Sequence, residues 1–184
     1  MAHKIGKQTI IIDSDVGILS SAAVGSKKEG EGPLGPDFDI ISDDSRFSEK
    51  TWEKAESKMQ ELACWKALKK AGLEMSDMDF IFSGDLLNQC IASSFNARGS
   101  GIPYIGLYGA CSTFAEGVGL SAVFADSFAK NCLAVASSHF CSVNGNTAFL
   151  LNMGASVRLP PNGQQPPPAQ RLFQETPVRH LSKR

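Results

Sequence analysis

The amino-acid sequence predicts an α/β layered fold with a mixed, mostly parallel sheet and covering helices. Short apolar strands alternate with helical stretches along residues 9–138. One strand leads through a tight turn straight into a helix rich in alanine and glycine, and such a helix can pack close to a sheet. No internal repeat of short period is visible.

The N-terminal part is predicted to be mostly irregular. Thr9–Ile12 is a short β-branched strand, and Ser20–Ala23 is a patch of small residues. Ser26–Pro36 is rich in glycine and proline, which predicts a loop. Phe38–Asp44 is predicted to be extended or loop.

The strongest helical pattern runs from Thr51 to Ala71, where apolar residues recur at steps of three and four. Ser48 is the predicted N-cap. Lys69 and Lys70 suit the negative end of the helix dipole, and Gly72 suits the left-handed residue that ends a helix.

A loop, Leu73–Met78, then leads to a strand at Phe80–Phe82. The second predicted helix is Leu86–Arg98, and a glycine turn separates it from a strand at Ile102–Leu107. A last buried strand is expected at Cys132–Ser138.

The turn after Ile102–Leu107 is the most informative feature, because it places Cys111 just before a helix expected at Thr113–Ala129. The dipole and free N–H groups of a helix N-terminus stabilise a thiolate, and a strand–turn–helix elbow presents a nucleophile at the carboxyl edge of a sheet. The alternative is a small buried hydrophobic residue, a common role for cysteine.

Composition bounds the function classes. The chain has 184 residues, 18 basic and 19 acidic side chains, so its net charge favours neither nucleic acid nor an anionic membrane. Five cysteines without CxxC spacing indicate reduced thiols in a cytosolic compartment. No apolar run is long enough to span a bilayer, and no signal peptide is present. We expect no cofactor and no metal site.

The character of the chain changes at Asn144. Six of the nine prolines follow it, and residues 160–168 have the composition of a low-complexity linker. Composition alone predicts a disordered tail over residues 144–184.

Two motifs, Y-G-A-C-S-T at Tyr108–Thr113 and S-S-H-F-C-S at Ser137–Ser142, are specific in combination. With F-S-E-K-T-W-E-K-A-E-S-K-M and I-F-S-G-D-L-L-N-Q, at Phe47–Met59 and Ile81–Gln89, they resemble the stage V sporulation protein AD family of spore-forming Firmicutes, within the thiolase-like superfamily. The resemblance covers Thr9–Val143 and implies that residues 1–143 are a partial thiolase-like domain, the first of two similar halves.

After Val143 the sequence departs from that family, which continues approximately E-R-Q-Y-R-F-P-L-E-Y-G-G-Q-R-T. If Asn144 onward is back-translated and one G is inserted before its first codon, permitted codons read E-R-Q-Y-R-F-P-L-E-Y-G in the shifted frame. The resemblance therefore implies that residues 144–184 are translated out of frame and form an unstructured tail.

The resemblance also implies a site. Cys111 aligns with the nucleophile of the catalytic members, whose partner residues come from the second half. His139 is a candidate base but does not match the family's catalytic histidine, and a structural role is the alternative.

The family is associated with binding dipicolinic acid and with its uptake into the developing spore. Arg98 is a candidate partner for a ligand carboxylate, a solvated helix end being the alternative. Phe114 is a candidate apolar wall of the pocket, with core packing as the alternative. The expected ligand-binding residues are Tyr108, Cys111, Ser112, Thr113, His139 and Phe140.

The implied partners are membrane proteins of the same stage V sporulation A operon. The expected location is cytoplasmic, peripheral at the spore inner membrane through these partners. A full-length homodimer is also implied, with Cys132–Ser138 as its edge strand. The alternatives are an acyltransferase or condensing enzyme that uses Cys111, and a fragment without function.

Overall fold

The computed structural model of the chain describes residues 1–87, 90–138 and 176–183. The strands of its main sheet are β3 (Val16–Ser26), β4 (Ile40–Ser42), β5 (Phe80–Gly84), β6 (Tyr104–Gly106), β7 (Asn131–Ala136) and β8 (Thr176–Lys183). The helices are α1 (Lys27–Gly30), α2 (Trp52–Ala71), α3 (Ile91–Ala97) and α4 (Thr113–Ser127), with 3-10 turns at Gly35–Asp37, Met75–Asp77 and Ala110–Ser112.

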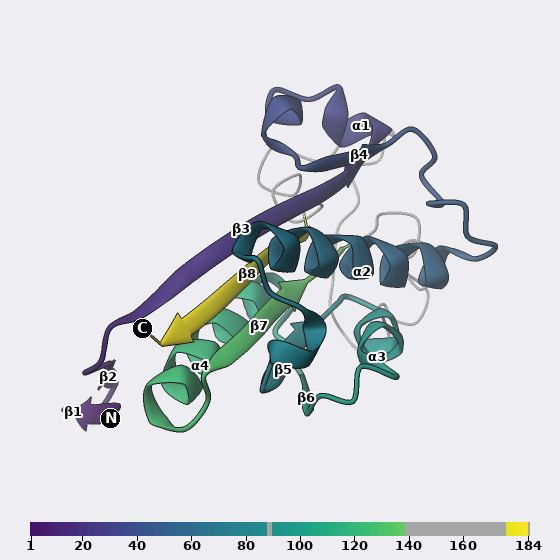
Figure 1. The fold of residues 1–184 in the computed structure, drawn as a ribbon. Coiled ribbons are helices and arrows are strands. Elements are labelled where there is room, and N and C mark those ends of the chain that lie inside the picture. Colours follow the sequence, from purple (N-terminus) through teal and green to yellow (C-terminus); the bar gives the residue numbers. More distant parts are fainter. Residues whose placement is uncertain (88–89, 139–175, 184) are drawn as a thin grey trace, which may run out of the picture.

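The six strands lie in the order β4-β3-β8-β7-β5-β6. Neighbouring pairs are parallel, except that β8 runs antiparallel to both β3 and β7. Helices α2 and α3 cover one face of the sheet and α4 covers the other (Figure 1). The α/β layered fold predicted from the sequence is therefore confirmed.

The position of β7 corrects one expectation. Cys132–Ser138 was expected to be an edge strand, but β7 lies inside the sheet between β8 and β5, and the edges are β4 and β6. Residues of β7 are almost completely buried, as is usual for a strand covered on both faces.

The longest strand, β3, corresponds to no predicted strand. Its sequence, V-G-I-L-S-S-A-A-V-G-S, is rich in small residues, which are weak strand formers by themselves. Here they allow α2 to lie close: the Ser20 hydroxyl donates to the Ala67 carbonyl at 2.7 Å, and Val24 is fully buried. Packing against α2, and not the local sequence preference, therefore makes this segment a strand.

The strand β8 occupies Thr176–Lys183, within the segment for which the sequence predicts an unstructured tail. It pairs with β3 from Val16 to Val24 and with β7 from Asn131 to Val135. Without it, the facing backbone groups of β3 and β7 would have no partners in the sheet, and unpaired buried backbone groups are costly. The rest of the predicted tail up to residue 175 lies outside the described residues, as does residue 184.

Helix α2 begins and ends close to the predicted bounds. Thr51 is its N-cap and accepts a hydrogen bond from the Lys54 N–H at 3.3 Å, while Gly72 ends it in the left-handed conformation with φ of 69°. Ser48, the predicted N-cap, instead has φ of 62°. Its N–H donates to the Asp44 carboxylate at 2.7 Å, which fixes a turn ahead of the helix.

The second helix is shorter than predicted. Residues Leu86–Arg98 were expected to be helical, but α3 begins only at Ile91, after Cys90 with φ of 52°. The Asp85 carboxylate accepts hydrogen bonds from the backbone N–H groups of Leu87 and Ser93, both at 2.8 Å, and this local turn competes with a continuous helix.

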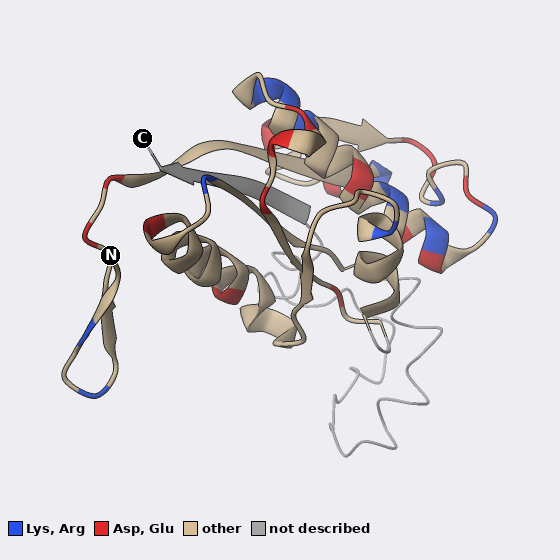
Figure 2. Ribbon diagram, turned by 60° about the horizontal axis from the view of Figure 1, so that its bottom comes forward, with Lys and Arg blue, Asp and Glu red and all other residues tan. Residues whose placement is uncertain are grey.

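The core has one cluster on each face of the sheet. On the α2 side it is the larger cluster, which includes Val24, Met59, Leu68, Ile81, Leu133 and Val135. On the α4 side it comprises Phe82, Leu107, Ala129 and Cys132, with Phe80, Ile105 and Phe124 packed against them. Helix α4 carries only two charged residues, Glu116 and Asp126, whereas α2 carries many of both signs (Figure 2).

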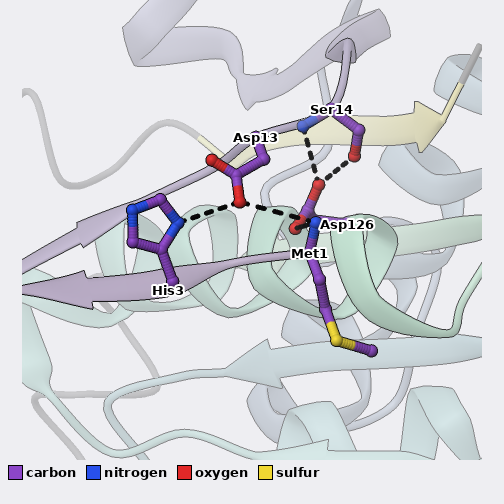
Figure 3. A network of polar contacts seen from close by, with 5 residues as sticks. All are labelled: Met1, His3, Asp13, Ser14 and Asp126. Atoms are coloured by element: carbon purple, nitrogen blue, oxygen red, sulfur yellow. Dashed lines mark hydrogen bonds and ion pairs between the residues drawn. The ribbon is translucent and has the colours of Figure 1, made fainter.

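A separate hairpin, β1 (His3–Ile5) and β2 (Thr9–Ile11), projects from the sheet at the N-terminus (Figure 1). It is tied to the end of α4 by polar contacts (Figure 3). The Asp126 carboxylate accepts hydrogen bonds from the N–H of Ser14, at 2.9 Å, and from its hydroxyl, and it lies 3.3 Å from the Met1 ammonium group. These contacts hold the pKa of Asp126 below its usual range, with the Ser14 hydroxyl as the main cause.

The hydrogen bond between His3 and Asp13, at 2.8 Å, joins the hairpin to the same network of polar contacts (Figure 3).

In the described residues no helix combines the length and the apolar character that crossing a membrane requires.

Candidate functional site

Three parallel strands, β7, β5 and β6, end side by side at one edge of the sheet. Ligand sites of α/β sheets form outside the carboxyl ends of such strands. The segments that follow these ends are Ser137 after β7, Asp85 after β5, and the elbow that leads from β6 to Cys111. The elbow predicted from the sequence is thus placed at the expected edge.

The backbone of the elbow is strained at one residue. Ala110 has φ of 48°, a left-handed conformation that costs a residue with a Cβ about 1–2 kcal/mol. It begins the 3-10 turn Ala110–Ser112, and α4 follows at once with Thr113. Cys111, inside this turn, is exposed to solvent. Of the four cysteines in the described residues, Cys111 alone is exposed.

The backbone donors predicted for a ligand are already used within the elbow. The Ser112 N–H donates to the Gly109 carbonyl at 3.0 Å, and the Thr113 N–H donates to the Ala110 carbonyl. The Thr113 hydroxyl oxygen accepts from the Gly109 N–H at 3.1 Å. A ligand at Ser112 or Thr113 would have to compete with these bonds or use the side chains.

An acidic side chain lies beside the turn. The Ser112 hydroxyl donates to the Glu116 carboxylate and lies 2.9 Å from the Gly109 carbonyl oxygen. A Cβ at Gly109 would meet the ends of the Glu116 and Ser112 side chains, so a larger residue there would require these side chains to move. The Glu116 side chain therefore lies beside Ser112, the residue that follows Cys111.

The other predicted ligand residues are placed in part. Tyr108 is 51% exposed and precedes the turn. Phe114 is half-buried in the first turn of α4. Arg98 is exposed at the end of α3, which matches the alternative of a solvated helix end. His139 and Phe140 lie outside the described residues.

A buried polar network at the same edge was not predicted from the sequence. The Gln60 side-chain amide donates to the Ser137 hydroxyl at 2.6 Å and to the Ser93 hydroxyl at 3.0 Å. Those hydroxyls donate in turn to Glu56, at 2.8 Å, and to Asp85, at 2.6 Å. The network joins α2, α3 and the ends of β5 and β7.

One signal in the sequence could have found it. Glu56 and Gln60 are four residues apart, directly after Ala55 and Met59 of the apolar stripe of α2, so both face the sheet. Both are fully buried. A polar pair on a buried stripe requires hydrogen-bond partners nearby.

Burial governs the titration of several groups here. It raises the pKa of Asp85 despite opposing hydrogen bonds from Ser93 and Leu87. It also raises the pKa of the Cys90 thiol, and raises those of Cys64 and Cys132 to about 12, so these three thiols remain protonated at neutral pH.

Solved structures of similar fold include a 3-oxoacyl-(acyl-carrier-protein) synthase and OleA. 3-Oxoacyl-(acyl-carrier-protein) synthase III from Aquifex aeolicus aligns with a TM-score of 0.55 and 16% identity, over 92% of this chain and 54% of that chain. A variant of OleA from Xanthomonas campestris aligns with a TM-score of 0.58 and 16% identity, over 94% of this chain and 57% of that one. At such identity the similarity shows a thiolase-like fold.

A closer relation is found in sequence. Stage V sporulation protein AD from Bacillus subtilis is 39% identical over 135 residues, which are 73% of this chain and 40% of that protein. This chain therefore spans well under half of the relative's length. The sequence profile described as Stage V sporulation protein AD matches residues 6–164, and the chain belongs to this family.

Proposed function

We propose that this chain is the N-terminal part of a sporulation protein that binds dipicolinic acid and assists its uptake into the developing spore. Membership of the stage V sporulation protein AD family carries the proposal. The edge formed by the ends of β5, β6 and β7, with the Cys111 elbow, is the proposed binding region. A planar pyridine dicarboxylate needs hydrogen-bond donors for its carboxylates and apolar walls for its ring.

The second candidate is acyl transfer through Cys111, and the exposed thiol on its elbow favours it. A base must activate such a thiol. The hydrogen bonds of the described elbow bring a carboxylate, Glu116, and two hydroxyls to the turn, and no imidazole or amine. The described elbow therefore supplies no imidazole to activate the thiol, and family membership carries the binding proposal.

Titration calorimetry with dipicolinate, on the 184-residue chain, tests the binding proposal. Isophthalate is the matched control, because it keeps the two carboxylates and replaces the ring nitrogen. We expect saturable binding of dipicolinate that exceeds that of isophthalate. Equal or absent binding of both would contradict the proposal, and a mass increase on Cys111 after incubation with an acyl thioester would favour the enzyme.

We further propose that residues 144–184 are read out of frame. Support comes from β8, which occupies an interior position of the sheet between β3 and β7, contacted by α2 and α4. A strand covered on both faces normally has a continuous apolar sequence. The sequence of β8 is T-P-V-R-H-L-S-K. It contains one proline, Pro177, and three residues with basic side chains, Arg179, His180 and Lys183.

Resequencing the gene across codons 140–150 tests the reading frame. The family match extends to residue 164, beyond the proposed shift, so only the DNA decides. A confirmed sequence followed by frequent stop codons in the shifted frame would reject the proposal. A restored base should open a longer frame with a second α/β half.

The remaining assignments follow from the family. We propose a homodimer for the full-length protein, and a location at the spore inner membrane through membrane partners of the same operon. Sedimentation of the frame-restored protein measures the first, and co-purification with those membrane proteins measures the second. A monomer throughout the micromolar range, or no co-purification, would contradict them.

A further inference from the structure

We propose that Gln60 is a positioning residue for the Cys111 elbow and acts on it through Gly84. The inference rests on the proposed function in one respect, because it treats the elbow as part of the ligand site. Gln60 does not touch the elbow itself. Its effect passes through the backbone of β5, which lies between α2 and the segment that follows β6.

The hydrogen atoms of the network fix the orientation of Gln60. The Ser137 hydroxyl has one hydrogen, which it donates to Glu56, so it can only accept from Gln60. The Ser93 hydroxyl likewise donates to Asp85 and accepts from Gln60. The amide nitrogen must therefore face both hydroxyls.

The amide oxygen is engaged as well, since it accepts from the Ser83 hydroxyl at 3.2 Å. Two donors and one acceptor are thus required at one buried position, and a glutamine amide supplies them. Glutamate has nearly the same shape but an ionised carboxylate donates no hydrogen bond. It would also place a third carboxyl group in a buried cluster that already contains Glu56 and Asp85.

Gly84 connects this network with the elbow. Its carbonyl oxygen accepts from the Ser137 N–H at 3.2 Å. The Gln60 amide nitrogen lies 3.4 Å from the same oxygen, as the weaker branch of a hydrogen that it already donates to a serine hydroxyl. On its other side, a Cβ at Gly84 would lie 2.1 Å from the Leu107 carbonyl oxygen and 2.5 Å from a methyl carbon of Thr113. The backbone of Gly84 is therefore held between Gln60 and the two ends of the elbow.

A backbone hydrogen bond completes the connection. The Leu107 N–H donates to the Ser83 carbonyl at 2.8 Å, next to Gly84. Because Leu107 and Thr113 flank the turn that carries Cys111, a displacement of Gly84 displaces both sides of the turn. Because closely packed segments leave no space between them, a shift of one segment moves its neighbours.

Gln60→Glu in the 184-residue chain is the direct test, read by hydrogen exchange of the elbow amides and by dipicolinate affinity. We expect exchange of peptides covering residues 107–114 to become at least about tenfold faster, and the affinity to fall by about tenfold. Ser137→Ala removes one branch of the network. It should give the same changes, but smaller ones. This variant keeps the proposal testable if Gln60→Glu fails to fold.

Ser20→Ala is the matched control. It removes a part-buried hydroxyl that donates to the Ala67 carbonyl at 2.7 Å, near the opposite end of α2. It should lower the melting temperature but leave elbow exchange and affinity unchanged.

Unchanged elbow exchange in folded Ser137→Ala and Gln60→Glu would overturn the inference, as would an equal effect of Ser20→Ala. If the unsubstituted chain binds no dipicolinate, the proposed function fails, and the exchange measurement still decides the role of Gln60.

Discussion

Replacing Gly84 with alanine tests how tightly β5 and the elbow are packed. The added Cβ would lie 2.1 Å from the Leu107 carbonyl oxygen, more than an ångström inside ordinary contact. The obstructing atom belongs to the backbone and cannot rotate away. The strands β5 and β6 must therefore separate locally, which also weakens the 2.8 Å bond from the Leu107 N–H to the Ser83 carbonyl.

The expected loss of stability combines two effects. Overpacking in a core costs about 1–3 kcal/mol, and a weakened backbone hydrogen bond adds about 0.5–1.5 kcal/mol. For a chain of this size, each kcal/mol lowers the melting temperature by roughly 2–4 °C, so Gly84→Ala should lower it by about 10 °C. Urea unfolding followed by circular dichroism measures the free energy directly.

Gly119→Ala is the matched control. Gly119 lies within α4, and a Cβ there meets no atom within 4 Å. Alanine should therefore stabilise the helix by about 0.5–1 kcal/mol. If Gly84→Ala is as stable as the parent, or if both substitutions have the same sign, the packing described between β5 and the elbow is wrong.

Three further predictions follow. Iodoacetamide should label Cys111 faster than Cys64, Cys90 or Cys132, because the last three thiols are buried and have raised pKa values; mass mapping that finds Cys64 or Cys90 labelled first rejects this. Burial raises the pKa of Asp85, so its carboxyl favours the folded state most below the unfolded pKa of about 3.9, and this contribution is lost as pH rises. The free energy of unfolding of the parent should therefore fall more between pH 4 and pH 7 than that of Asp85→Asn. Urea unfolding that shows the same change with pH for both proteins would contradict this. Last, the 184-residue chain should be less stable than a frame-restored protein, because α4 leaves Leu120 37% exposed and Phe128 beyond its end is 68% exposed, and burying each such side chain contributes about 1.5–3 kcal/mol; a sharp melt at the same temperature for both chains argues against it.

The sequence predicted those parts of the fold that local signals determine. Helix α2 has a regular apolar stripe and a terminal glycine, and the helical stretch predicted at Thr51–Ala71 agrees to within one residue, although Thr51 and not Ser48 is its N-cap. The elbow was likewise recognisable, because a strand, a tight turn and a helix follow each other within a few residues. In these cases the deciding interactions lie close together in the chain.

Other parts depend on contacts distant in sequence. β3 is a strand because α2 packs on its small residues, and its composition alone did not predict one. The segment that forms β7 was expected to be an edge strand because nothing in the sequence locates β8 beside it. The network around Gln60 joins residues separated by up to 81 positions, so only the folded structure brings its members together.

The interior place of β8 affects how the chain is made. Val16 of β3 pairs with Lys183, so the sheet joins residues that are 167 positions apart in the chain. At about 5–20 residues per second, a ribosome needs on the order of ten seconds between them. During that interval β3 and β7 emerge with unpaired backbone groups, open to strands of neighbouring nascent chains. Correct formation of this sheet therefore requires β3 and β7 to stay unpaired with other chains until β8 is available.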